Sequence, residues 1–119
     1  MCRDRGSVTI WAITLTGLIW FGASAAALYG SAVVGRHRAE AAADLAALAA
    51  AEHVVDGSEA ACAAGARIAT VNGGSLRGCH IVGDDVEVTV SRQVGLGGLG
   101  AFPAVARARA GPVPDEEEP

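Results

Sequence analysis

The chain has 119 residues and a mass of 11.9 kDa, which is enough for one small domain. Hydrophobic residues make up 51% of it and aromatic residues only 4%, and alanine is the largest single contributor to the apolar share. The formal net charge of −4 comes from the acidic run 115–118, so the rest of the chain is neutral. Such a body, whose nine basic residues are all arginine, lacks the concentrated basic surface that nucleic-acid binding needs.

The most distinctive segment lies near the N-terminus. Residues 8–34 contain no charged residue, histidine, side-chain amide or proline. As a helix rising 1.5 Å per residue the segment is roughly 40 Å long, which exceeds the ~30 Å hydrocarbon core of a bilayer. Trp11 and Tyr29 lie near its two ends, where aromatic rings favour the membrane interface. The remaining chain is too short and too rich in alanine and glycine to bury this rod on every side, so we predict a transmembrane helix.

A cleavable secretory signal is the alternative for this segment. Arg3 and Arg5 would form its basic region, and the small residues at 23–25 and 25–27 would offer cleavage sites. The apolar run continues past these sites to Val34, whereas the apolar core of a signal spans about 7–15 residues. We therefore favour a retained anchor. Its orientation stays open at this point, because two arginines flank each end of the segment.

After Gly35 the pattern becomes amphipathic. Polar side chains recur at four-residue spacing, and the opposite face is apolar. We predict that this face is a helix-packing stripe, formed by Ala41, Leu45, Leu48 and Ala49. Small side chains allow another helix to approach closely, although the helix propensity of alanine alone would give a similar pattern. No proline interrupts the chain, so one continuous helix is expected from about Val8 to Glu52.

A second, shorter helix is expected next. Asp56 and Glu59 have the spacing of a capping box at its start, and the pair Gly73-Gly74 is expected to end it. The apolar residues of this helix recur at helical spacing, at Ala61, Ala64, Ile68 and Val71.

A small antiparallel sheet is expected after the second helix, because the apolar period changes to two. Cys79 and Ile81 begin the alternation, and Gly83-Asp84-Asp85 turns the chain. The alternation continues at Val86, Val88 and Val90, and a last strand alternates at Ala104, Ala106, Ala108 and Ala110. The fold class predicted for the whole chain is α+β.

Apparent chemical motifs in the chain have simpler explanations. Residues 95–100 match G-x-G-x-x-G, but an alternating segment follows them where a dinucleotide site needs a helix. His37, His53 and His80 lack the paired spacing of metal ligands, and Cys79-His80 would point to opposite faces of a strand. We therefore predict no catalytic residue, no cofactor and no metal, and we find no sign of a small-molecule substrate.

Cys62 and Cys79 have an explanation as a pair. One lies on the second predicted helix and the other on the strand that follows it. A disulfide between them would join helix to sheet and contribute about 3 kcal/mol in the chain-entropy model. It would also favour a location outside the cytosol, where disulfides persist. Two unrelated buried thiols are the alternative. Cys2 is expected to be free.

Two stretches then carry a resemblance to a known family. Arg5-Gly6-Ser7-Val8-Thr9 before the apolar helix, and the alanine-rich run 42–51, resemble the TadE/TadG family of Flp (tight-adherence) pilus assembly proteins. The later motifs at 71–73, 79 and 83–88 are similar to a short actinobacterial TadE-like subgroup found near helicase and secretion genes. The resemblance implies a pilin-like minor subunit with a cytoplasmic N-terminus, one transmembrane helix and an exported α+β domain.

The resemblance also points to a leader junction between Gly6 and Ser7. Pilin-type leaders similar to this one are cut after a glycine, with a glutamate five residues into the mature chain. Here Trp11 stands at the position of that glutamate. Both cleavage and polymerisation by the usual pilin route are therefore open, and we favour a subunit that does not itself polymerise.

These observations define an expected organisation and function. We expect a cytoplasmic leader (1–7), a transmembrane helix (8–34), an exported domain (35–112) and an acidic disordered tail (113–119). We expect a non-enzymatic, single-pass membrane protein that acts as a minor pilin-like or scaffold component of a Tad/Flp-type pilus or secretion assembly. Its expected partners are the membrane and other subunits of that assembly, which it would contact through helix packing. The alternatives are an anchored or secreted binding module of the cell envelope and, with no residues to support it, a soluble exported enzyme.

Overall fold

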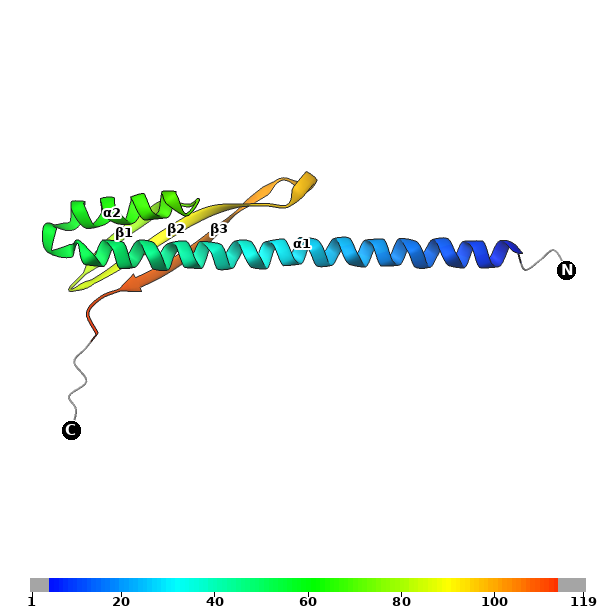
Figure 1. Cartoon of the computed structure of the whole chain (residues 1–119), viewed down its shortest axis with the longest axis horizontal. Helices are drawn as coiled ribbons and strands as arrows, with labels where there is room; N and C mark the ends of the chain where they lie inside the picture. Colours follow the sequence, from blue (N-terminus) through cyan, green and yellow to red (C-terminus); the bar gives the residue numbers. More distant parts are fainter. Residues whose placement is uncertain (1–4, 114–119) are drawn as a thin grey trace, which may run out of the picture.

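A computed structural model describes residues 5–113 and shows an α+β fold, which confirms the predicted class (Figure 1). Short 3₁₀ turns follow the first helix and separate the last two strands. In chain order the elements are α1 (Arg5–Glu52), a 3₁₀ turn (Val54–Asp56), α2 (Ser58–Val71), β1 (Ser75–Val82), β2 (Asp85–Gly95), a second 3₁₀ turn (Gly97–Leu99) and β3 (Ala101–Ala110).

The long helix α1 is continuous, as predicted, and its N-terminal half projects alone beyond the rest of the fold (Figure 1). The apolar side chains of that half are exposed, including Trp20 at 71% and Phe21 at 75%. Its hydroxyl groups are nevertheless bonded. Thr14, Thr16 and Ser24 each donate a hydrogen bond of 2.8 Å to the carbonyl four residues earlier. These bonds satisfy the polar groups within the helix, which is what an apolar environment requires.

The three strands form an antiparallel sheet in the order β1-β2-β3. The central strand β2 carries the predicted alternation, and Val86, Val88 and Val90 are completely buried. β2 and β3 continue as a two-stranded hairpin beyond the end of β1, because β1 pairs only as far as Ser91 of β2. Facing pairs in this extension run as far as Gly95 and Ala101.

Two helices cover one face of the sheet, with α1 over β2 and β3 and α2 beside β1. The core is built from small residues: Ala39, Ala42, Ala43, Ala46, Ala47 and Ala50 of α1 face the valines of β2 and Ala104, Ala106 and Ala108 of β3. Gly65 of α2 lies against Ala46 and Ala50 of α1. Alanine and glycine at these positions let the helices approach each other and the sheet closely.

The structure corrects two of the expectations drawn from the sequence. α2 begins after Gly57 with no side-chain cap, and Asp56 lies in the preceding 3₁₀ turn, so the expected capping box is absent. Val71 is 77% exposed, and Ala69 is buried in its place. The predicted leader and tail fall mainly on residues 1–4 and 114–119, which lie outside the described part of the chain together with Cys2.

Candidate functional site

The predicted helix-packing stripe is not the face with which α1 packs inside the chain. Leu45 and Leu48 are 47% and 56% exposed, and Ala41 is also exposed. Ala49 is half-buried at the edge of this face. The core is formed by the opposite face of α1, which carries only alanine and glycine there, because the sheet lies too close for a leucine. The leucines therefore remain available to a neighbouring molecule.

This exposed stripe continues along the apolar half of α1. Residues seven apart are displaced by only about 20° around a helix at each step, because two turns take 7.2 residues, so they form a line that winds slowly around it. The line that includes Leu48 is apolar along the whole helix, at Ile13, Trp20, Ala27, Val34, Ala41 and Leu48. All six side chains are exposed. An uninterrupted apolar line of this kind is typical of a helix that packs lengthwise against another helix.

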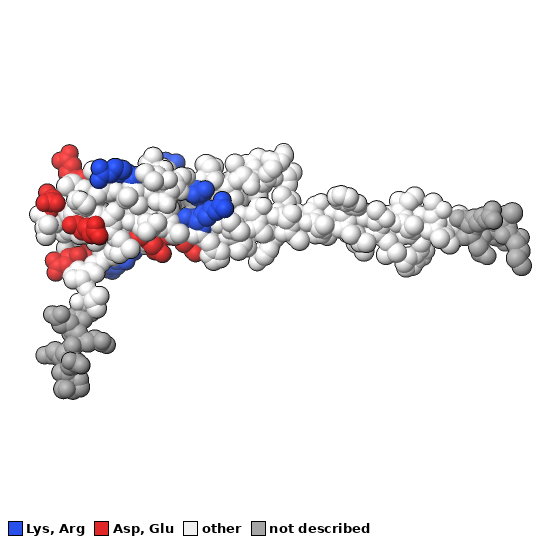
Figure 2. Space-filling view, viewed as in Figure 1, with Lys and Arg blue, Asp and Glu red and all other residues white. Residues whose placement is uncertain are grey.

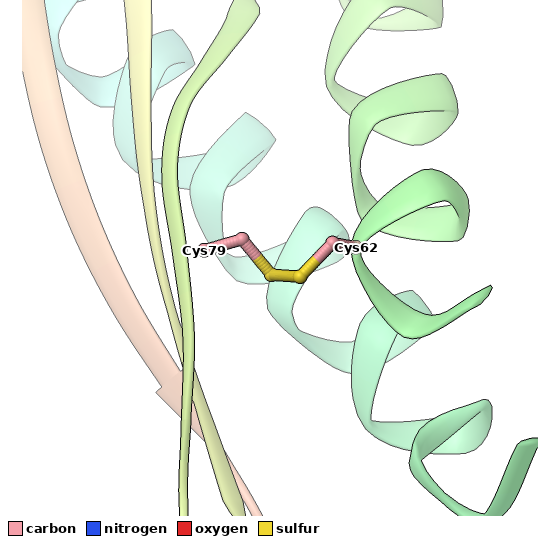
Figure 3. Close-up of a disulfide and its surroundings, with 2 residues drawn as sticks. All are labelled: Cys62 and Cys79. Atoms are coloured by element: carbon pink, nitrogen blue, oxygen red, sulfur yellow. A yellow bond between two sulfur atoms is a disulfide. The ribbon is translucent and has the colours of Figure 1, made fainter. Parts of the chain in front are cut away.

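Cys62 and Cys79 form the disulfide expected from the sequence (Figure 3). Their Cα atoms are 5.9 Å apart, and the bridge joins α2 to β1. It therefore fixes α2 to the outer strand of the sheet, on the side of the fold away from β3.

A second tie holds the C-terminal end of α2. The guanidinium of Arg92 on β2 donates a hydrogen bond of 2.6 Å from Nη1 to the carbonyl oxygen of Asn72, the residue that caps the helix. A cation at this position satisfies a terminal carbonyl and complements the helix dipole. This contact has no local signature in the sequence, because the two residues are 20 positions apart in the chain.

The fold does not bring the histidines and acidic residues of the described chain together into a metal or catalytic site. Nδ1 of His53 lies 2.9 Å from the carbonyl oxygen of Ala49, and Nδ1 of His37 lies 3.3 Å from Glu40, each within α1 or at its end. Among residues 5–113, no group of three or more histidine, cysteine, aspartate or glutamate side chains is placed to hold a metal ion. The glycine-rich run 95–100 connects two antiparallel strands, so it is a hairpin turn and has no helix after it.

The helix α1 is also the part of the chain that matches a known family. The chain matches the model of putative Flp pilus-assembly TadE/G-like proteins over residues 6–53. The long helix is a TadE/G-like segment. The match confirms the resemblance to the TadE/TadG family predicted from the sequence. It runs from the second residue of α1 to the residue after its end, whereas α2 and the sheet lie outside it. No match was found among the curated proteins or the solved structures with which the chain was compared.

The TadE/G-like helix is also the one described helix that is long and apolar enough to cross a membrane. None of its most apolar stretch is buried against other described residues. A buried core helix would satisfy the same length and composition, but here the apolar surface has no covering within the described chain. One such helix near the N-terminus indicates a membrane anchor, as expected for a pilus protein.

Proposed function

We propose that this protein is a single-pass membrane subunit of a Tad/Flp-type pilus or secretion assembly, where it acts as a minor pilin-like or scaffold component and not as an enzyme. The observation that carries the proposal is the exposed apolar line of α1. It runs through the TadE/G-like segment from Ile13 to Leu48 and has no partner within the described chain.

The proposed mechanism is lateral packing of α1 against the helix of a neighbouring subunit. In the membrane the contact would use Ile13, Trp20 and Ala27, and outside it the predicted stripe, with Leu45 and Leu48 as its largest side chains. Association within lipid depends on close packing, whereas outside it burial of the leucines adds a hydrophobic contribution. The sheet and α2 would then be held at a fixed orientation to the partner.

We further propose that the N-terminus is cytoplasmic and that α2 and the sheet are exported. The disulfide between Cys62 and Cys79 supports this orientation, since such bridges persist outside the cytosol. The proposed leader junction at Gly6 and Ser7 lies in the first turn of α1, where both residues are exposed.

Site-specific photocrosslinking in cells tests the packing proposal. A photoreactive phenylalanine analogue placed at Leu45 or Leu48 should crosslink this chain to a subunit of the pilus assembly. The matched control is Ala63, an exposed position on α2. Equal crosslinking from all three positions, or crosslinks to unrelated envelope proteins alone, would contradict the proposal and favour a binding module of the cell envelope.

A further inference from the structure

The β2–β3 hairpin runs back along α1 toward its apolar half. In the turn before β2, Asp84 lines the same groove as Leu48 and Glu52 of α1. At the end of β2, Gly95 lines a groove with Gly30, and Phe102 of β3 lines another with Tyr29. The turn at residues 96–100 therefore reaches further toward the N-terminus of α1 than any other part of the sheet (Figure 1).

This end of the hairpin carries no charge. No charged residue lies between Arg92 and Arg107, just as none lies between Gly6 and Gly35 of α1. Figure 2 shows the consequence on one face of the molecule, where the charged side chains gather over the far end of the domain and the end nearest the projecting helix is uncharged. The two uncharged segments lie side by side where Tyr29 and Phe102 line one groove.

The turn exposes leucine and no polar side chain. Positive φ angles at Gly97 (63°) and Gly100 (98°) explain two of its glycines, since other residues rarely adopt this conformation. Leu99 is 74% exposed, and Leu96 is half-buried. Transfer of an exposed leucine side chain from water into an apolar layer is favourable by about 0.8 kcal/mol per buried CH₂.

Some backbone amides and carbonyls of the turn form hydrogen bonds with one another. The amide of Leu96 donates to the carbonyl of Gly100 at 2.8 Å, and the amides of Leu99 and Gly100 donate within the turn at 3.4 Å. Moving an unpaired backbone amide or carbonyl out of water is costly, and this cost keeps open loops out of the hydrocarbon core. Hydrogen bonds within the turn lower that cost. A turn with partial satisfaction suits the interfacial layer, where water and headgroups remain within reach.

Arginines mark the boundary of the uncharged region. Arg38 of α1 and Arg92 of β2 line the groove that also contains Gly30 and Gly95. Arg36, whose side chain is 79% exposed, lies on the same stretch of α1. Arg92 donates to the carbonyl of Asn72, and Arg36 pairs with Glu40 at 3.3 Å. Guanidinium groups pair well with phosphate, so at this height Arg38 would meet the headgroups of a bilayer crossed by the adjoining apolar helix.

We propose that the β2–β3 turn, residues 96–100, rests in the interfacial layer of the same bilayer that α1 crosses, as a second contact between this protein and lipid. The inference rests on the proposed membrane span. It adds that the domain contacts the membrane surface with the turn end of its hairpin, at a fixed depth, with Leu99 among the headgroups and upper acyl chains. Continuity of the uncharged surface with α1 identifies lipid, and not a second protein, as the occupant.

Depth-dependent fluorescence quenching of the full chain in vesicles tests this inference. The vesicles contain phosphatidylcholine and phosphatidylglycerol, with a doxyl-labelled lipid as quencher. An environment-sensitive nitrobenzoxadiazole probe is attached to Leu99→Cys in a Cys2→Ser background, where Cys62 and Cys79 remain bridged. Matched variants carry the probe at Ile19→Cys, within the apolar half of α1, and at Val55→Cys, which is 92% exposed at the far end of the domain.

The expected result is a blue shift and a loss of fluorescence at positions 99 and 19, with neither change at 55. Quenching at 19 without quenching at 99 would overturn the inference and leave the membrane span intact. An unquenched probe at 19 would overturn the span itself, and the second lipid contact with it. Equal quenching at 55 and 99 would show that the probe inserts wherever it is placed, which also contradicts a specific contact at the turn.

Discussion

Gly35 of α1 lies so close to Val94 of β2 that a β-carbon on Gly35 would come within 2.5 Å of both γ-methyl carbons of that valine. Val94 is 6% exposed, so it has little room to move aside. The contact lies where the hairpin leaves the three-stranded sheet and continues along α1. It therefore packs the two-stranded extension of the hairpin against α1.

The first prediction concerns this contact. Gly35→Ala should destabilise the fold, because overpacking costs about 1–3 kcal/mol, of which the better helix propensity of alanine returns at most about 1 kcal/mol. Thermal unfolding of the full chain in detergent micelles, followed by the circular dichroism of the sheet, measures the change. Val94→Ala in the same chain should restore part of the lost stability, because it removes both methyl groups.

The control for this pair is Gly30→Ala, since a β-carbon there meets nothing within 4 Å. It should leave the midpoint of unfolding unchanged or raise it. Strict additivity of Gly35→Ala and Val94→Ala would show that the two residues do not interact.

A second prediction concerns the crossing of the two helices. A β-carbon on Gly65 would lie 3.1 Å from the carbonyl oxygen of Ala46, which is backbone and cannot rotate away. Gly65→Leu should therefore lower the free energy of unfolding by at least about 1–3 kcal/mol. Ala63→Leu, on an exposed position of the same helix, should have little effect. Equal losses of stability in both variants would contradict close packing at Gly65.

A third prediction concerns the disulfide. Cys62→Ser or Cys79→Ser should each lower the free energy of unfolding by about 3 kcal/mol, the chain-entropy value for the loop of this bridge. Reduction of the natural chain should give the same loss, and Cys2→Ser should not. Non-reducing mass spectrometry of protein from the native envelope should find the peptides of Cys62 and Cys79 linked. Two alkylatable thiols at these positions would contradict the bridge and weaken the proposed orientation.

Topology gives a fourth prediction. A phosphatase that is active only after export, fused after Gly111, should be active in cells, because the oxidised domain is proposed to lie outside the cytoplasm. A reporter that works only in the cytosol should be silent at the same position. The reverse pattern would place α2 and the sheet in the cytoplasm.

A fifth prediction concerns polymerisation. If the chain is cut after Gly6, the new amine of Ser7 meets no carboxylate from a neighbouring copy, because Trp11 stands where pilin-type chains similar to this one carry glutamate. We therefore expect immunogold labelling at the base or tip of filaments or in the membrane, and N-terminal sequencing will show whether the leader is removed. Labelling along the whole length of purified filaments would contradict the prediction.

The sequence predicted the elements of this fold better than their contacts. The apolar run and the valine alternation have unambiguous periods, so both α1 and β2 were expected where they occur. The face of α1 that packs on the sheet was not predicted, because alanine lies on both sides of the helix and only the leucine-bearing stripe stands out in the sequence. Leu45 and Leu48 are exposed for a physical reason: the sheet approaches α1 too closely to admit them.

The place of the hairpin turn was not predictable from local pattern. The charge-free stretch between Arg92 and Arg107 was visible in the sequence, but its significance depends on which part of α1 it lies beside. That position is set by two long-range contacts, between Gly35 and Val94 and between Arg92 and Asn72. Neither contact has a signature at short range in the chain.

The uninterrupted course of α1 has a mechanical consequence. At 1.5 Å per residue the helix from Arg5 to Glu52 is about 72 Å long. Because it has no proline and no break, it acts as a shaft: a rotation of its N-terminal half about the helix axis turns the sheet through the same angle. A neighbouring helix that packs against Ile13, Trp20 and Ala27 can therefore turn the domain without contacting the sheet or α2, and a force on the sheet is transmitted to the apolar half of α1.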